Sequence, residues 1–235
     1  MRRGTAKVEL LGVGLYTPPE VARLVGLSPP TVRRWIGGYT FTYKAQGDRR
    51  FGHSEPIVTG TVPRLRNLHA IDFQELIEIF VVSVFLRHRV PMRTIRRASK
   101  RASEILDTPH PFATHGFKVF GKKIFLDDEF RHLLELADRQ HAFYEILHPY
   151  LESVEFDPRT KLPQQWWPMG KESPIVLNPH IAFGEPVFAG SRLPVRTVLN
   201  ALAAGEDAKA ISYWYNISPE HVSAAKAFLS RGLAA

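Results

Sequence analysis

The amino-acid sequence predicts a mainly α-helical protein with short β-hairpins, and three observations support this fold class. Residues 17–35 contain two short helical patterns joined by a single glycine, and residues 39–51 alternate aromatic with polar side chains before a polar turn. Three further helical patterns fill residues 195–231. Because 44% of the 235 residues are hydrophobic and 23% are charged, the chain has the composition of a packed protein of about two domains.

The first segment carries the signals of two capped helices around a turn. Thr17 is placed to cap a helix that begins at Pro18, where proline is tolerated, and ends near Val25. Gly26 supplies the turn, and Ser28 caps a second helix whose first turn holds two prolines. The buried side of this second helix is expected to consist of Leu27, Val32 and Trp35. The pattern therefore predicts a helix-turn-helix.

Three polar side chains of the second helix are left to face outward, namely Thr31, Arg33 and Arg34. In a helix-turn-helix this is the face of the recognition helix, which lies in the major groove of DNA. We therefore expect these residues to contact DNA. Arginine serves phosphate or guanine equally well, so the pattern does not specify the bases.

Residues 39–51 predict a two-stranded wing with a basic tip. Aromatic side chains alternate along its first strand, and a polar turn leads to Arg49 and Arg50. We expect both arginines to contact DNA, because cations of the helix and of the wing occur in one basic segment. The alternative is an ordinary surface hairpin whose arginines are solvated.

The distribution of charge supports a polyanionic partner for this end of the chain. The formal net charge is +8 and the sequence pI is about 9.8. Residues 1–66 hold eleven lysines and arginines against four acidic residues, so nearly all of the excess lies there. The chain contains no cysteine, which excludes disulfides, thiolate zinc sites and cysteine catalysis.

Two helices are predicted in the middle of the chain. Residues 72–88 carry a wide apolar face, which suits either the core of one protomer or the pairing of two. A helix over residues 91–106 follows, with Arg93, Arg96, Arg97, Lys100 and Arg101 on one side. These cations form either a solvated face or a contact for phosphate or an acidic partner, for which Arg93 and Arg97 are the candidates.

The remaining segments predict a hairpin turning at Gly121, a helix from Asp127, and a second hairpin with Trp166 and Trp167. Short apolar runs broken by glycine and proline then predict strands or an extended arm before the three C-terminal helices. We divide the chain into a DNA-binding domain, a helical middle or dimerisation region, a linker or hairpin, and a C-terminal helical domain, at residues 1–66, 67–150, 151–173 and 174–235.

Residues 16–51 resemble the winged helix-turn-helix of MerR-type regulators. In that family a T-x-R-x-aromatic stretch in the second helix is followed by a wing that ends in G-x-R-x-aromatic. The matching residues are Thr31, Arg33, Trp35, Gly47, Arg49 and Phe51. Long regulators of this type usually pair through a helix after the DNA-binding domain, so the resemblance implies a homodimer on operator DNA.

Residues 174–232 resemble a small domain associated with antitoxins that are paired with PIN-domain ribonucleases. Its hallmark is G-x-P-V-x-x-G-[ST]-R-[IL]-P-V, followed by a glycine-interrupted helical bundle. The matching residues are Gly184, Pro186, Val187, Gly190, Ser191, Arg192, Leu193, Pro194 and Val195. Chains that combine both halves are similar to VapB-type antitoxins. The resemblance implies a repressor of its own operon that silences a PIN-fold ribonuclease toxin, alone or in a larger hetero-oligomer. The metal chemistry would belong to the toxin.

Partner contacts are expected at three side chains of the C-terminal half. Arg192 either ties the extended arm to its own domain or meets the carboxylate-rich cleft of the toxin. Trp166 and Trp167 are the other candidates. In a second class of function, a MerR-like ligand-responsive regulator without a toxin, the two tryptophans would line a small-molecule pocket.

The sequence contains no catalytic, cofactor or metal motif, so we expect a protein that is not an enzyme. His110 and His115 are five residues apart but lack the H-E-x-x-H pattern, and neither G-x-S-x-G nor a P-loop is present. The most apolar segment, residues 77–86, is about half the length of a membrane span. With no secretion signal either, we expect a cytoplasmic protein.

Overall fold

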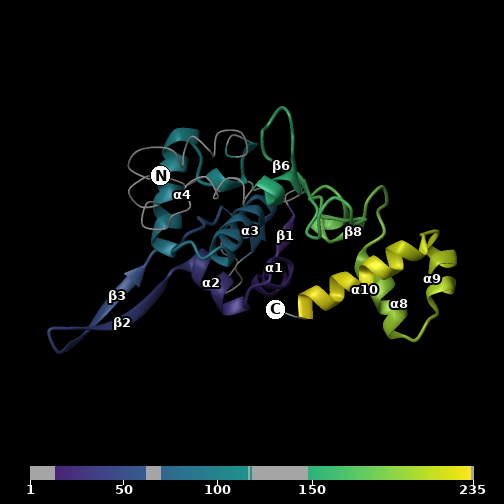
Figure 1. The fold of residues 1–235 in the computed structure, drawn as a ribbon, viewed down its shortest axis with the longest axis horizontal. Coiled ribbons are helices and arrows are strands. Elements are labelled where there is room, and N and C mark those ends of the chain that lie inside the picture. Colours follow the sequence, from purple (N-terminus) through teal and green to yellow (C-terminus); the bar gives the residue numbers. More distant parts are fainter. Residues whose placement is uncertain (1–13, 62–69, 116, 118–147, 234–235) are drawn as a thin grey trace, which may run out of the picture.

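The fold is mainly α-helical with short two-stranded hairpins, as the sequence predicts (Figure 1). The structure, a computed structural model, describes residues 14–61, 70–115, 117 and 148–233. The hairpin predicted at Gly121 and the helix predicted from Asp127 lie outside the described residues.

The N-terminal unit has the predicted order of two short helices and a hairpin. Its elements are β1 (Leu15–Tyr16), α1 (Pro18–Val25), α2 (Pro29–Gly37), β2 (Tyr39–Ala45) and β3 (Asp48–Ser54). Strand β1 pairs antiparallel with β4 (Ile71–Asp72), which leads directly into the central helix. The β2–β3 hairpin extends away from the body of the molecule (Figure 1).

Helix α3 (Phe73–Arg87) forms the centre of the first hydrophobic core. Asp72 caps it by accepting a hydrogen bond from the Glu75 N–H at 2.7 Å, and the Glu75 carboxylate accepts one from the Asp72 N–H at 3.0 Å. Every residue from 75 to 85 is buried, because α1, α2 and the segments after α4 cover its sides. This enclosure within one chain favours the core interpretation of the apolar face.

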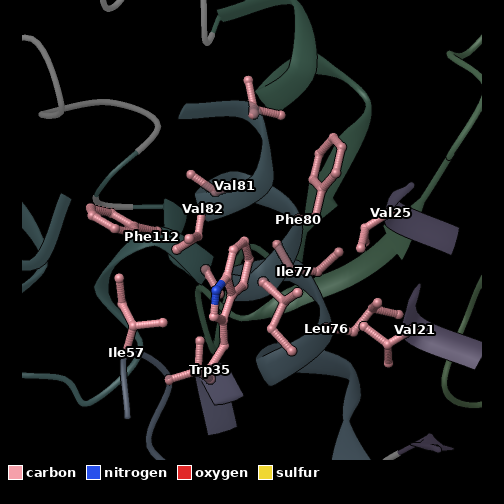
Figure 2. Packing of buried hydrophobic residues seen from close by; sticks show 14 of the residues in the cluster. Val21, Val25, Trp35, Ile57, Leu76, Ile77, Phe80, Val81, Val82 and Phe112 are labelled. Carbon is pink, nitrogen blue, oxygen red and sulfur yellow. The ribbon is translucent and has the colours of Figure 1, made fainter. Parts of the chain in front are cut away.

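Figure 2 shows this packing around Leu76, Ile77 and Phe80 of α3, with Trp35 of α2 and Phe112 inserted from other elements. Phe112 belongs to the short 3-10 helix η1 (Pro111–Ala113), which follows α4 (Met92–Leu106).

A second hairpin, predicted from the sequence, closes another side of α3. It consists of β5 (Val154–Phe156) and β6 (Pro163–Trp166). The Trp166 ring is fully buried, with its centroid 4.8 Å from that of Phe80. The hairpin is thus part of the first core.

The C-terminal part has a core of its own, built on three helices as predicted. Its elements are β7 (Ile175–Val176), η3 (Ala182–Gly184), β8 (Val187–Phe188), α8 (Val195–Ala203), α9 (Ala208–Tyr215) and α10 (Pro219–Leu233). The last helix runs back to α1, so the end of α10 lies beside the N-terminal unit (Figure 1). The first core includes residues from 16 to 177, so it extends across the boundaries predicted after residues 66, 150 and 173. The division into four regions therefore stays a prediction.

In the part of the chain that the structure describes, every helix is too short or too polar to cross a bilayer.

Candidate nucleic-acid interface

Two caps place the helices of the candidate DNA-binding surface. In a capping box, the Glu20 N–H donates to the Thr17 hydroxyl at 3.4 Å, and the Glu20 carboxylate accepts from the Thr17 N–H at 2.7 Å. Gly26 ends α1 at a φ of +72°, a left-handed conformation that glycine adopts without strain. Ser28 caps α2 by accepting from the Thr31 N–H at 3.3 Å. The predicted helix-turn-helix is confirmed.

Helix α2 has one buried side and one exposed side. Its buried residues are Val32, Trp35 and Ile36. The exposed side carries Arg33 and Arg34, as the sequence predicts. Thr31 is only partly exposed, and its hydroxyl lies 2.8 Å from that of Ser28. A contact between Thr31 and DNA would therefore compete with the cap.

The hairpin turns at Gln46 and Gly47, whose φ values of +54° and +90° are those of a type I′ turn. This turn sets the register so that Lys44 lies opposite Arg49. Neighbouring residues in a strand point to opposite faces, so Arg49 and Arg50 do not share a face. Lys44 is a cation of the tip that sequence reasoning missed, although its pairing follows once the turn is placed at these two residues.

An aromatic ladder covers the hairpin face that carries Arg50. The ring centroids of Tyr39, Phe41 and Tyr43 are 6.0 and 6.1 Å apart along it, and each side chain is between 40% and 46% exposed. The Arg34 guanidinium lies 5.6 Å from the Tyr39 ring centroid, which is a cation–π distance. The arginine of the recognition helix therefore meets the base of the hairpin.

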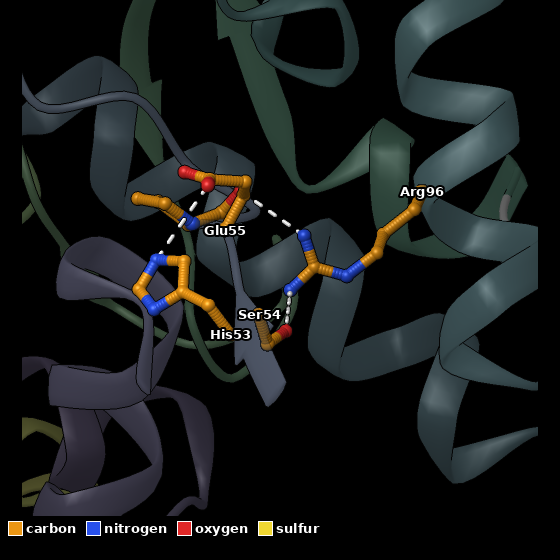
Figure 3. Close-up of polar contacts among 5 residues, drawn as sticks. His53, Ser54, Glu55 and Arg96 are labelled. Atoms are coloured by element: carbon orange, nitrogen blue, oxygen red, sulfur yellow. Dashed lines mark hydrogen bonds and ion pairs between the residues drawn. The ribbon is translucent and has the colours of Figure 1, made fainter. Parts of the chain in front are cut away.

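Arg96 of α4 holds the other side of the hairpin base (Figure 3). Its guanidinium donates to the Pro56 carbonyl and to the Ser54 hydroxyl, each at 3.1 Å. Arg96 is half-buried and its guanidinium is engaged by the chain itself, so this member of the cationic side of the helix is not left to solvent or to a partner. Arg93 and Arg97 are exposed and stay candidates for a partner contact.

The backbone adds a second anchor, since the Trp35 carbonyl accepts from the N–H groups of Ile57 at 2.8 Å and Val58 at 3.2 Å. Helix α2, the hairpin base and α4 are thus joined by specific hydrogen bonds. Such a framework fixes the direction in which the long hairpin leaves the body.

A buried carboxylate stabilises the next layer of this framework. Glu78 of α3 is only 1% exposed, and it accepts a hydrogen bond from the Ala113 N–H at 2.8 Å. Burial raises the pKa of Glu78 to about 8, because the charged form loses its hydration, although hydrogen bonds from the Phe112 and Ala113 backbone oppose the shift. Burial also raises the pKa of Glu75, helped by the nearby Asp72.

The expected partner residues of the C-terminal half have different environments. Arg192 is exposed and makes no hydrogen bond or ion pair with the described part of the chain. Arg196, which sequence reasoning missed, instead ties the arm by an ion pair with Glu185 at 2.8 Å. Trp167 is half-buried beneath Lys171, whereas Trp166 has no exposed surface and cannot meet a partner or a ligand unless the core opens.

Two exposed aromatic residues of α9 were also missed. Tyr213 is 86% exposed and Trp214 is 57% exposed, while the neighbouring Ile211 is fully buried. Three consecutive aromatic residues on a short helix are the available signal, because one helix face cannot bury all of them. Exposed tyrosine and tryptophan are typical of protein–protein contacts.

Among the described residues, no three His, Asp or Glu side chains converge as metal ligands. His110 is buried in the core, and burial lowers its pKa. His115 lies beyond η1, with its ring 5.8 Å from that of Phe156.

Comparison with known families gives the class of each half. Residues 14–99 match the family described as "Putative DNA-binding HTH domain", which covers α1, α2, the hairpin and the start of α4. Residues 175–229 match the family described as "Protein of unknown function (DUF433)". The chain therefore contains a region similar to a family of helix-turn-helix DNA-binding domains, followed by a region similar to the DUF433 family.

Individual relatives share both halves. The chain is 27% identical to the "Putative antitoxin VapB45" of Mycobacterium tuberculosis over 93% of its own length and 95% of that protein. It is 24% identical to the "Uncharacterized protein Rv2308" of the same organism, over 94% and 92% of the two chains. The crystal structure of Rv2018 from Mycobacterium tuberculosis has the same fold, with a TM-score of 0.70, 22% identity, and coverage of 92% and 98%. The resemblance to VapB-type antitoxins is thus supported along nearly the whole chain.

Proposed function

We propose that the protein is a non-enzymatic antitoxin that binds operator DNA to repress its own operon and neutralises a PIN-domain ribonuclease toxin in the cytoplasm. The observation that carries the proposal is the exposed pair Arg33 and Arg34 on α2, next to a projecting hairpin with a basic tip. The similarity to an antitoxin over 93% of the chain supports the toxin partner.

On DNA, α2 enters the major groove, where Arg33 and Arg34 reach phosphates or guanine edges. The hairpin strands are seven residues each, so they reach roughly 23 Å from the body and follow the DNA backbone with Lys44, Arg49 and Arg50. Two protomers of a homodimer read two half-sites about 34 Å apart.

The toxin binds at the opposite end of the molecule. The hairpin and α9 lie at opposite ends of the long axis in Figure 1, so one chain has room for DNA and a protein partner at once. Tyr213 and Trp214 supply exposed aromatic surface there, and Arg192 is available for a carboxylate of the toxin.

The test of DNA binding is a fluorescence anisotropy titration of the full chain with the DNA upstream of its own operon, over a series of salt concentrations. Arg33→Ala is expected to weaken binding by at least tenfold and, where a phosphate contact is lost, to lower the salt slope by about 1. The matched control is Arg159→Ala, an exposed arginine of the β5–β6 turn. An affinity and a salt slope for Arg33→Ala equal to those of the native protein would remove Arg33 from the interface.

Binding of a toxin is tested by capturing the tagged protein from its host after nuclease treatment and identifying the proteins that are recovered with it. A small protein with a PIN-like acidic cluster, recovered at near-equal stoichiometry, is the expected result. Recovery of the protein alone at every salt concentration would favour the second candidate function, a MerR-like ligand-responsive regulator. One observation favours that candidate, a cavity between the N-terminal and C-terminal units.

A further inference from the structure

A cavity of about 370 Å³ lies where the C-terminal helices return to the N-terminal unit. Ligand pockets of proteins commonly begin at roughly 300 Å³ and occur at junctions between domains. Most of its wall is apolar and comes from helices of both units. Apolar side chains that line it include Leu24 of α1, Val195 and Leu199 of α8, and Phe228 and Leu229 of α10.

The two walls of the cavity approach each other at two places. The Tyr16 hydroxyl donates to the Gly184 carbonyl at 2.8 Å on one side. On the other side, α10 packs near α1. The cavity is therefore bounded by a hydrogen bond between the two units on one side and by the packing of α10 near α1 on the other.

The charges on the cavity wall favour an anion. Both carboxylates of the lining are already engaged, Glu20 by the capping box of α1 and Glu185 by Arg196. Arg23 lines the cavity without a hydrogen bond or ion pair to the described residues. Arg231 also lines it and donates to the Pro168 carbonyl, which is neutral.

Arg231 is exposed at the cavity and pairs with no carboxylate among the described residues. Partial burial lowers the pKa of Arg231, and the neighbouring positive charge of Arg87 lowers it further. A bound anion would give Arg231 the opposite charge that the two carboxylates of the lining do not provide, because Glu20 and Glu185 are engaged elsewhere.

The mouth of the cavity has an unusual backbone. Ala182 and Phe183 have φ values of +48° and +56°, a left-handed conformation that is rare for residues other than glycine. This turn leaves the Phe183 ring 78% exposed although it lines the cavity. A strained turn that presents an aromatic ring at a cavity is a feature of ligand sites.

We propose that this cavity binds a small amphipathic anion, whose apolar body lies between α1, α8 and α10 and whose acidic group pairs with Arg23 and Arg231. Such a ligand contacts the DNA-binding unit and the C-terminal unit at once. The site does not depend on the proposed toxin or operator.

The probe for the test is decanoate, with decanol as a neutral molecule of equal chain length. The full protein, labelled at leucine methyl groups, is titrated with each below micelle formation and followed by NMR. Decanoate is expected to shift the methyl signals of Leu24, Leu199 and Leu229 in a saturable way, and to bind at least fivefold more tightly than decanol. Shifts confined to leucines outside the cavity, or equal affinities for the two probes, would overturn the proposal.

Two variants test the two parts of the site. Arg23→Gln is expected to weaken decanoate by fivefold or more and to leave decanol unchanged, whereas the control Arg159→Gln changes neither. Leu199→Trp fills the cavity and is expected to abolish binding of both probes. If Leu199→Trp fails to fold, Leu229→Trp is used in its place. Native affinity for decanoate in Arg23→Gln would contradict the ion pair. The assay contains neither DNA nor toxin, so its outcome is separate from that of the proposed function.

Discussion

The Tyr16 hydroxyl donates a hydrogen bond to the Gly184 carbonyl at 2.8 Å, across 168 residues of sequence. Tyr16 is the last residue of β1 and directly precedes Thr17, the cap of α1, and Gly184 ends η3 in the C-terminal arm. Both groups are buried. Burial and the nearby carboxylates raise the pKa of the Tyr16 hydroxyl, so it stays protonated and remains a donor at every physiological pH. This bond joins the DNA-binding unit to the C-terminal unit.

Tyr16→Phe is expected to lower the free energy of unfolding by about 1 kcal/mol, because the buried Gly184 carbonyl loses its donor while the ring still fills its place. Chemical denaturation measures the change. The matched control is Tyr39→Phe on the exposed hairpin, which is expected to leave stability unchanged. An equal stability for Tyr16→Phe and the native protein would mean that water replaces the bond at no cost.

Arg96→Gln is expected to weaken operator binding by roughly three- to tenfold, a loss of about 1 kcal/mol. The arginine does not have to touch DNA for this, because it holds the hairpin base through Pro56 and Ser54. Anisotropy titrations are expected to give an unchanged salt slope, with Lys100→Gln, an exposed cation of the same helix, as the control. A slope lowered by about 1 would instead identify Arg96 as a phosphate contact.

The sequence predicts the parts of this interface that depend on neighbouring residues. Thr17, Gly26 and Ser28 define both helices of the helix-turn-helix by local capping, and the alternating aromatic residues define the hairpin. These signals act within four residues or across one turn, so they can be read without knowledge of the fold.

Long-range contacts account for what was missed or corrected. Arg96 bonds to residues about forty positions earlier in the chain, and Trp166 enters a core whose centre is α3. Whether such a side chain is exposed or buried depends on which helices and strands pack together. The hydrophobic periodicity of a single segment does not contain that information. Arg196, and not Arg192, forms the ion pair with Glu185 that ties the arm to its domain. This choice also depends on the path of the arm.

Glu78→Gln is expected to stabilise the protein at pH 8 and to flatten its stability profile. The folded-state pKa of about 8 lies above the ordinary value of 4.5, so the folded protein binds the extra proton between these values. Stability of the native protein therefore falls as pH rises from about 4.5 to 8, by a few kcal/mol in order of magnitude. The amide keeps an acceptor for the Ala113 N–H but cannot ionise.

Urea denaturation of both proteins from pH 5 to pH 8.5 measures this effect. Glu172→Gln, at an exposed carboxylate outside the core, serves as the control for a general change in charge. Parallel profiles for Glu78→Gln and the native protein would show that Glu78 ionises freely in the folded state.

The double substitution of Tyr213 and Trp214 by alanine is expected to weaken binding of the captured toxin at least tenfold. Both rings are largely exposed, so their removal takes contact area from a partner and little from the fold. Calorimetric titration of the toxin measures the affinity, and thermal unfolding of the free chain is expected to change by no more than a few degrees. Tyr39→Ala at the opposite end gives the reciprocal control, because it is expected to change operator binding and leave toxin binding intact. Native toxin affinity in the α9 variant would move the partner surface to the arm, where Arg192 is exposed.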